Sequence, residues 1–392
     1  MIEQKFTKRI VNNSNSCKKI VQPNCTLFKS HIDIINSLPF LNVSYNLSSN
    51  LASKTHATIN SQNEINIFYI NHEKQFSSNI YCLISLEKLI INFVDTTISS
   101  EIKNLNKLIE LEIGYNQVLS SIPNEIGQLR LLKILKIHSC PLLRTLPDDM
   151  KHLTNLISLT VEYSSITKIP TFIRDLTVLE TLYLYNNKIT VFWDTIAGLT
   201  RLKHLDLNFN PLTSISANIR NIPRLQGLQL RGCNLKYVPN FITQLYSLTT
   251  LDLSGNSLVS LPLTFIHLQK LHWLHLGSNK FQQIPREILL LYKLEYLFMS
   301  YNSISSLSGL GILKTLKSLD LRGNQLCTIP EEIENLVSLT ELNLSDNYLS
   351  HLSTELLTGI QHLSEVYLYN NLFSDTEHTK IKNLLKNTSV FI

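Results

Sequence analysis

The sequence repeats itself on a period of about 23 residues, and this period constrains the fold more than any other feature. Between Leu248 and Pro262, apolar residues stand at positions 1, 4, 6 and 11 of a frame whose position 9 is asparagine. The same frame returns 23 residues later, between Leu271 and Pro285. A fixed period of this length is typical of a chain in which each unit packs only against its neighbours.

The frame continues along most of the chain. Position 1 of the regular units falls on leucines 22 to 24 residues apart, namely Leu108, Leu132, Leu156, Leu179, Leu202, Leu225, Leu248, Leu271, Leu294, Leu316, Leu339 and Leu363. Three irregular units precede them, marked by Leu38, Leu41, Val43 and Asn46, then by Ile65 and Ile67, then by Leu86, Leu89 and Ile91. We therefore predict about fifteen units, with the atypical ones at the end of the stack.

Each unit contains two hydrophobic periods. The inward positions 4 and 6 alternate with outward neighbours, as a short strand requires. After position 11, apolar residues recur every three to four residues, which suits a helical or 3₁₀ turn. Strands stack about 4.8 Å apart, whereas turns are bulkier. The sequence therefore predicts a curved α/β solenoid with a parallel β-sheet on the concave face and helical or 3₁₀ turns on the convex face.

This frame divides the chain into five parts. We predict a basic, flexible tail over residues 1–26, an N-terminal cap over 27–37, degenerate repeats over 38–107, regular repeats over 108–373 and a C-terminal cap over 374–392. In the last part, Val390 and Ile392 occupy positions 4 and 6 of a final strand, after an amphipathic turn with Ile381, Leu384 and Leu385.

Position 9 is asparagine in most regular units, and cysteine at Cys140 and Cys233. A buried asparagine can bond the backbone N–H and C=O groups that a turn leaves open. We interpret these residues as architectural, with the two cysteines as small fillers of the same slot.

The charges are unevenly placed. Residues 1–30 hold six basic side chains and one acidic one, whereas the other 362 residues hold 29 of each. Because a nucleic-acid-binding body needs a basic stripe, we expect no nucleic-acid partner. The sequence also lacks an apolar run of about 18 residues, so we expect no membrane insertion.

The six cysteines are scattered, without close pairs: Cys17, Cys25, Cys82, Cys140, Cys233 and Cys327. We interpret them as reduced thiols. Residues 1–17 contain basic residues but no apolar core of a secretory signal. Both features predict a cytoplasmic location.

Residue patterns for catalysis are weak. His272 and His275 are two candidate metal ligands, but on a strand at positions 2 and 5 they point differently and have no further ligand nearby. Paired acids at Asp148–Asp149 and Glu331–Glu332 stand where a first helical turn favours negative charge. We predict neither an enzyme nor a cofactor or metal site.

The concave face is the part of the surface that the core leaves free to vary. Two groups of side chains stand out there as candidates for binding a protein, because aromatic residues and arginine are enriched at binding hot spots. One group is Trp273, His275, Tyr296, Phe298 and Tyr301, and the other is Tyr183, Tyr185, His204, Asp206 and Phe209, with Arg231 and Arg322 as further candidates. Aromatic residues on adjacent strands can also simply stabilise each other, so both interpretations stay open.

The pattern Leu-x-x-Leu-x-Leu-x-x-Asn-x-Leu-x-x-Leu-Pro, which covers about Leu38 to Phe373, resembles the intracellular Ras-group class of leucine-rich repeats. That class includes plant Ras-group proteins, the Ras-binding phosphatase scaffold, and the repeat regions of Scribble and Erbin. The resemblance implies a cytoplasmic, non-enzymatic scaffold whose concave face binds a signalling protein such as a small GTPase or a phosphatase subunit. The alternatives are a substrate-recognition subunit of a ubiquitin ligase or phosphatase complex, or a microbial effector that targets a host protein.

Overall fold

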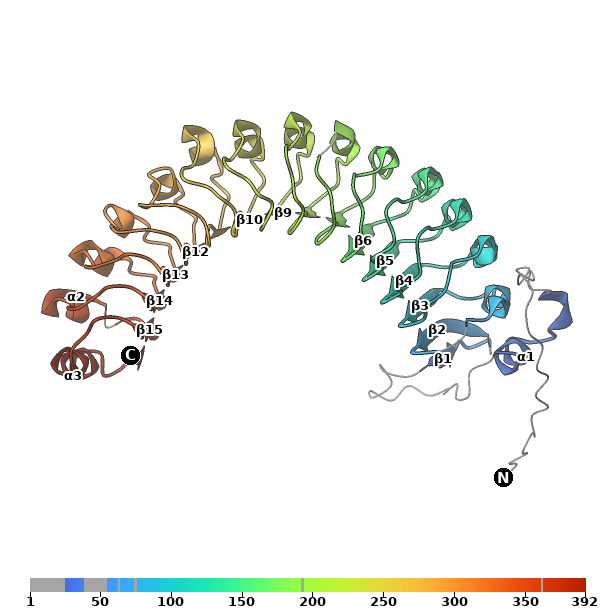
Figure 1. Ribbon diagram of the computed structural model, residues 1–392, viewed down its shortest axis with the longest axis horizontal. Helices are drawn as coiled ribbons and strands as arrows, with labels where there is room; N and C mark the ends of the chain where they lie inside the picture. The colour runs from blue at the N-terminus through green and yellow to red at the C-terminus, as the bar shows by residue number, and fades with distance from the viewer. Residues whose placement is uncertain (1–24, 39–54, 63, 74–75, 192–193, 361) are drawn as a thin grey trace, which may run out of the picture.

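The computed structural model describes residues 25–38, 55–62, 64–73, 76–191, 194–360 and 362–392. They form one curved solenoid, with strands along the inner, concave side and short helical turns along the outer, convex side (Figure 1). The predicted α/β solenoid is confirmed. Residues 1–24 of the predicted tail and most of the unit that begins at Leu38 lie outside the described residues, whereas residues 25 and 26 lie in a 3₁₀ turn.

All strands of the described chain belong to one open, 16-stranded sheet, in which each strand pairs with the next along the sequence. Strand β1 is antiparallel to β2, and the later pairs are parallel. The strands are β1 (His56–Ile59), β2 (Ile65–Asn71), β3 (Lys88–Asn92), β4 (Glu110–Gly114), β5 (Ile134–His138), β6 (Ser158–Glu162), β7 (Thr181–Tyr183), β8 (His204–Asp206), β9 (Gly227–Gln229), β10 (Thr250–Asp252), β11 (Trp273–His275), β12 (Tyr296–Phe298), β13 (Ser318–Asp320), β14 (Glu341–Asn343), β15 (Glu365–Tyr367) and β16 (Ser389–Phe391).

The convex turns are mostly 3₁₀ helices, and α-helices occur at the two ends. The helices are η1 (Cys25–Leu27), α1 (His31–Asn36), η2 (Ser78–Cys82), η3 (Ser100–Asn104), η4 (Asn124–Gln128), η5 (Asp148–His152), η6 (Thr171–Asp175), η7 (Asp194–Gly198), η8 (Ala217–Asn221), η9 (Asn240–Gln244), η10 (Leu263–His267), η11 (Ile288–Leu290), η12 (Leu310–Ile312), η13 (Glu331–Asn335), α2 (Thr354–Gly359) and α3 (Asp375–Leu384). Several begin directly after a proline, such as Pro170 before η6 and Pro262 before η10. The proline ring fixes φ near the −64° and −69° found there, which holds the approach to the turn extended.

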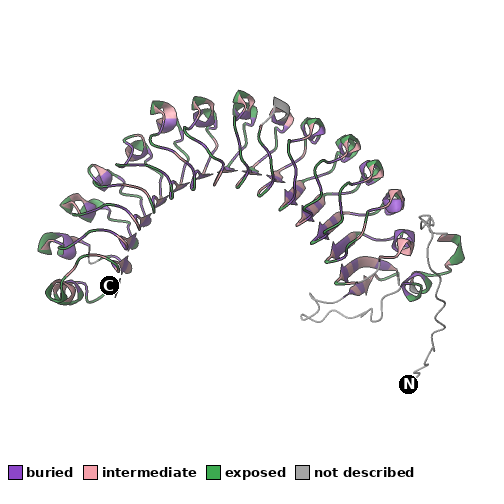
Figure 2. Ribbon diagram, in the orientation of Figure 1, coloured by how far each residue is buried: buried purple, intermediate pink, exposed green. Residues whose placement is uncertain are grey.

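The predicted inward positions form a continuous core. Leu251 and Leu253 are both fully buried, and the leucines of the other units surround them in one cluster. Burial follows the strands along the whole arc, while the outer ends of the turns are exposed (Figure 2). The register predicted for the regular repeats is therefore confirmed.

One irregular unit has a different register from the one predicted. We expected Ile65 and Ile67 at positions 4 and 6, but Phe68 pairs with Leu89, and Ile70 pairs with Ile91. Phe68 and Ile70 are fully buried, whereas Ile67 is half-buried. The prediction was wrong because the strand is longer than in the regular units: Ile65 is buried at its start, and Phe68 and Ile70 continue the buried rows of Leu89 and Ile91.

The asparagines at position 9 hold neighbouring units together. The Asn256 side-chain amide donates to the carbonyl oxygens of Leu230 and Leu253, at 2.8 and 2.9 Å. Its Oδ1 accepts from the backbone N–H of Cys233 and of Leu235, at 3.0 and 2.9 Å. One buried side chain thus satisfies backbone groups of two units. The architectural interpretation of position 9 is confirmed.

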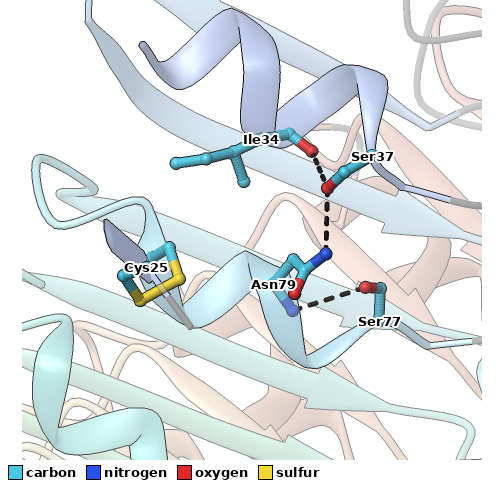
Figure 3. Close-up of a disulfide and its surroundings, with 6 residues drawn as sticks. Cys25, Ile34, Ser37, Ser77 and Asn79 are labelled. Atoms are coloured by element: carbon cyan, nitrogen blue, oxygen red, sulfur yellow. Dashed lines mark hydrogen bonds between the residues drawn. A yellow bond between two sulfur atoms is a disulfide. The ribbon is translucent and has the colours of Figure 1, made fainter. Parts of the chain in front are cut away.

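The N-terminal end is closed by α1 and by a disulfide between Cys25 and Cys82. The helix has a capping box, in which Ser30 and Asp33 bond each other's backbone N–H. At its end, Ser37 donates to the carbonyl of Ile34 and accepts from the amide of Asn79 at 2.9 Å, which fixes α1 on η2 (Figure 3).

The disulfide corrects the interpretation of all six cysteines as reduced thiols. Cys25 and Cys82 are 57 residues apart, and only the packing of the cap onto the first turns brings them together. Of the others in the described chain, Cys140 and Cys233 are buried free thiols and Cys327 is exposed. Burial raises the pKa of the Cys140 thiol to about 11 and that of Cys233 to about 12, so neither is a ready nucleophile.

Helix α3 and strand β16 follow the regular units at the C-terminal end. Val390 of β16 pairs with Val366 of β15, which places it at position 4. Helix α3 buries Ile381, and Leu385 follows it into the core. In the part of the chain that the structure describes, no helix is both long and apolar enough to cross a bilayer.

Candidate protein-binding surface

Concave side chains are those that flank the buried residue of each short strand. On β11, Leu274 is fully buried, so Trp273 and His275 on either side of it face the concave surface. On β12, Tyr296 and Phe298 flank the buried Leu297 in the same way. Because the strands pair in register, the concave side chains form continuous rows across the sheet.

The structure brings three of the predicted residues into contact on β11 and β12. The ring centroids of Trp273, His275 and Phe298 lie 5.5 to 5.7 Å apart in all three pairs. All three side chains are only half-buried. We call these three residues the central aromatic cluster. Tyr296, the strand neighbour of Trp273, is exposed beside it.

Tyr301 does not join the central aromatic cluster. It follows β12 with a left-handed backbone, at φ 54°, and it is 50% exposed. The guanidinium of Arg322 lies over its ring, 5.5 Å from the centroid, and also 5.4 Å from the ring of Tyr369. Asp346 binds the same guanidinium at 2.6 Å. Tyr301 and Arg322 therefore form a separate group at the edge of the sheet.

Asp252 is the concave residue next to the cluster on β10, and it is only 6% exposed. The Asp252 side chain is covered by neighbouring concave side chains and does not enter the core, which the flanking Leu251 and Leu253 fill. Burial opposes its ionisation, but the nearby His275, whose Nδ1 lies 3.7 Å from Oδ1, and hydrogen bonds from the hydroxyl and N–H of Ser254 outweigh burial, so its pKa is lowered. The carboxylate therefore stays charged beside the aromatic rings.

The second predicted group is divided. Tyr183 and Asp206 are neighbours across β7 and β8. Tyr185 instead contacts the ring of Tyr163, 5.0 Å away. Burial raises the pKa of Asp206 to about 6, and the charges of Asp252 and Glu162 act in the same direction. The hydrogen bond from the Asn208 N–H lowers the pKa but does not outweigh them.

The remaining predicted residues flank this group. His204, which shares strand β8 with Asp206, is exposed. Arg231, also exposed, lies over the Phe209 ring at 5.4 Å.

Sequence reasoning missed a row of aromatic rings along the edge where the strands end. His72, Phe93 and Tyr115 stack at 4.1 and 4.0 Å, and each has a left-handed backbone. Phe93 and Tyr115 are about two-fifths exposed. In the observed register these residues all occupy position 8 of the frame. Reading that position along the predicted frame would have found Phe93 and Tyr115 but not His72.

Sequence reasoning also missed an ionic network on β3 to β5. Glu110 binds Lys88 at 2.9 Å and Lys136 at 3.3 Å. Glu112 lies 3.3 Å from the His138 ring, which occupies the space that a Cβ at Gly114 would need. Hydrogen bonds from His138 and Asn92 lower the pKa of Glu112 to about 2, despite its burial.

The described residues contain no group of three or more His, Cys, Asp or Glu residues arranged to hold a metal ion. A hollow of about 510 Å³ is open and lies between outer turns, away from the concave surface. It is lined by Tyr246, Ile266, His267, Gln269, Leu290 and Tyr292.

An open arc of strand-and-turn units with a free concave sheet defines a solenoid repeat protein. The chain belongs to the leucine-rich-repeat family: the model of the leucine-rich repeat region matches residues 86–219, and the leucine rich repeat model matches 223–281, 269–326 and 314–373. Members of this family are generally non-enzymatic modules that mediate protein–protein interactions. No curated protein matches the sequence.

Several solved structures are similar to this one. A leucine-rich-repeat protein of Leptospira interrogans has 31% identity and a TM-score of 0.69, over 82% of this chain and 93% of that one. An internalin from Listeria monocytogenes has 22% identity and a TM-score of 0.62, over 84% and 90% of the two chains, and shows the fold alone. The receptor of the TLR13–ssRNA13 complex has 25% identity and a TM-score of 0.68, over 83% of this chain and 50% of that one.

Proposed function

We propose that this protein is a non-enzymatic scaffold that binds a signalling protein on its concave surface. The observation that carries the proposal is the central aromatic cluster. Trp273, His275 and Phe298 present half-buried rings on two neighbouring strands of the sheet. Such rings gain free energy when a partner covers them, because they bury a large area with few rotatable bonds to fix.

The surface is formed before any partner arrives. Each strand of the cluster is bonded to its neighbours, and the core beneath it is filled. Binding therefore costs little ordering of this chain, which favours a module whose role is recognition. The resemblance to the Ras-group class adds a small GTPase or a phosphatase subunit as the kind of partner that we propose to test first.

The compartment is a separate part of the proposal. The cytoplasmic location expected from the sequence relied partly on reduced cysteines, whereas Cys25 and Cys82 form a disulfide. Disulfides persist mainly in oxidising compartments. The disulfide thus favours a second candidate function, a microbial effector whose concave surface binds a host protein outside the reducing cytosol.

The test compares full-length variants in affinity purification followed by mass spectrometry from the source cells. Trp273→Ala combined with Phe298→Ala should remove the main partner. A matched control, Tyr237→Ala with Tyr348→Ala, removes two exposed aromatic residues from outside the central aromatic cluster and should retain that partner. Thermal unfolding of each variant establishes that it is folded. An unchanged partner set for the first variant would show that the central aromatic cluster is not the binding site.

A further inference from the structure

The concave surface changes its charge along the arc. We call positions 3, 5, 7 and 8 of the units from β6 to β15 the acidic surface. It carries seven carboxylates and two arginines, a net charge of −5: Glu162, Asp206, Asp252, Asp320, Glu341, Asp346 and Glu365 against Arg231 and Arg322. The same positions on β3 to β5 carry two lysines and two glutamates, which balance. Since residues 31–392 are neutral as a whole, the acidic surface departs from the chain's own average.

The fold requires a hydrogen-bond acceptor at some of these positions, but it does not require a negative charge there. At position 5, Asp206 and Asp320 each accept a hydrogen bond from the backbone N–H two residues later, at 2.8 and 3.0 Å. Asn343 makes the same bond at 3.1 Å in the same position. A neutral amide therefore satisfies the turn equally well. Asparagine at either position would accept the same bond, so the bond does not require the negative charge of Asp206 and Asp320.

The charges of the acidic surface are also poorly neutralised. On β3 to β5 both lysines bind carboxylates, at 2.9 to 3.8 Å. Among the described residues of the acidic surface, Asp346 binds Arg322 and Asp252 faces His275, but the other five carboxylates form no ion pair. Like charges on a half-buried surface repel one another and oppose folding. An unbalanced surface of this kind is explained by a ligand of opposite charge.

We propose that the acidic surface binds a basic, extended segment of a partner protein, with an apolar residue of that segment on the central aromatic cluster. This inference rests on the proposed function and specifies its partner. The cluster divides the acidic surface in two, with Asp206 and Asp252 before it and Asp320, Glu341 and Glu365 after it. The fitting segment therefore has Lys or Arg on both sides of an apolar residue.

The strand spacing sets the spacing of that segment. Asp206 on β8 is three strands before Trp273 on β11, which is about 14 Å at 4.8 Å per strand. An extended chain rises about 3.3 Å per residue, so a basic residue about four positions from the apolar one reaches Asp206. Asp320 is the direct neighbour of Phe298. On that side a basic residue one or two positions away is sufficient.

The same charge disfavours nucleic acids and anionic membranes, whose phosphates the surface would repel. The similarity to the receptor of the TLR13–ssRNA13 complex therefore does not extend to this property. A basic segment also exists in this chain, since residues 1–24 hold five lysines and arginines against one glutamate. The experiment must separate that segment from a partner.

The probe is a fluorescein-labelled peptide of about 15 residues, long enough to span ten strands at about 3.3 Å per residue. It carries lysines on both sides of a central Phe-Leu pair, and a second peptide carries glutamates instead. Fluorescence anisotropy with the full chain should show binding of the lysine peptide only, and raising NaCl from about 50 to about 300 mM should weaken it. Equal binding of the glutamate peptide would overturn the proposal.

Two variants with equal charge changes locate the binding. Asp206→Asn, Asp320→Asn, Glu341→Gln and Glu365→Gln together should weaken binding of the lysine peptide about fivefold or more. The control combines Asp148→Asn, Asp175→Asn, Glu331→Gln and Glu355→Gln, four exposed carboxylates of convex turns, and should change it less than about twofold. Equal effects would mean that only the overall charge matters, and the proposal would be wrong.

The outcomes also separate this inference from the proposed function. If Trp273→Ala with Phe298→Ala loses the cellular partner but the acidic-surface variant retains it, the concave surface binds a partner that is not basic. If neither variant loses the partner, the concave surface is not the binding site. If replacing the five basic residues among residues 1–24 by glutamine strengthens peptide binding about fivefold, this chain's own segment is the occupant and the partner segment is not.

Discussion

The side-chain amide of Asn279 donates a hydrogen bond to the carbonyl oxygen of Leu253, 2.9 Å away in the preceding unit. The Asn279 Oδ1 accepts from the N–H of Leu258 at 3.0 Å. Asn279→Ala leaves these buried groups without partners, and we expect the free energy of unfolding to fall by about 3 kcal/mol. Urea unfolding measures this. The control, Asn335→Ala at an exposed convex position, should change the free energy of unfolding by less than about 0.5 kcal/mol. An equally small effect at Asn279 would contradict the structural role of the asparagines at position 9.

The disulfide predicts a stability effect confined to one end of the solenoid. Cys25→Ser with Cys82→Ser removes a cross-link between residues 57 apart, and we expect a loss of about 3 kcal/mol. Because each unit contacts only its neighbours, the loss should appear as faster hydrogen exchange in β2 and β3 and not in β12. Dithiothreitol should act on the natural chain in the same way and have no effect on the variant. Exchange that rises along the whole arc would contradict this local role.

The period alone was sufficient to predict the sheet, because Leu251, Leu253 and their equivalents must all face one core. It could not predict the disulfide, since no local pattern links Cys25 with Cys82. The register at Ile65 and Ile67 was predicted wrongly, because a longer strand offers two alternating apolar rows and only packing selects between them.

The candidate surface was predictable as a surface but not as a set of contacts. Position 5 and position 7 were correctly placed on the concave side. The repeat frame does not specify side-chain rotamers, and these decide which neighbour a long side chain contacts. Tyr185, for example, contacts Tyr163. The imbalance of charge can be counted from the sequence alone. Only the structure shows that, among the described residues, five of the later carboxylates form no ion pair whereas both lysines on β3 to β5 do.

Glu112 should make stability depend on pH in the acid range. Its pKa in the folded chain is about 2, below its ordinary value near 4.5, because His138 and Asn92 bond the carboxylate. Its contribution is therefore fully present above about pH 4.5 and lost as the pH falls towards 2. Glu112→Gln should cost about 2 kcal/mol at pH 7 and very little near pH 2.5. Urea unfolding at both pH values checks this, with Glu331→Gln as the exposed control.

Asp206 should have the opposite effect on stability. Burial raises its pKa to about 6, from an ordinary value of 3.8. The protonated form therefore stabilises the fold at low pH, and this contribution is lost as the pH rises from about 4 through 6. Asp206→Asn keeps the bond to the Asn208 N–H without the charge, so it should be more stable than the natural chain at pH 7 by about 1 kcal/mol. The difference should disappear near pH 4, and a destabilised variant at pH 7 would contradict the effect of burial.

The same titration predicts that binding of the lysine peptide strengthens as the pH rises through about 6, because Asp206 then gains its charge. The other groups around it are Tyr183, Gln229, Glu162, Asp252, Arg231 and His204, and His275 lies next to Asp252. His204 and His275 are replaced by glutamine in both proteins compared, so that histidine charge plays no part. In that background we expect affinity to rise about threefold between pH 5 and 7.5 with Asp206 and to stay nearly constant with Asp206→Asn. An equal rise in both proteins would mean that a different carboxylate binds the lysines, and Asp320→Asn in the same background would then identify it.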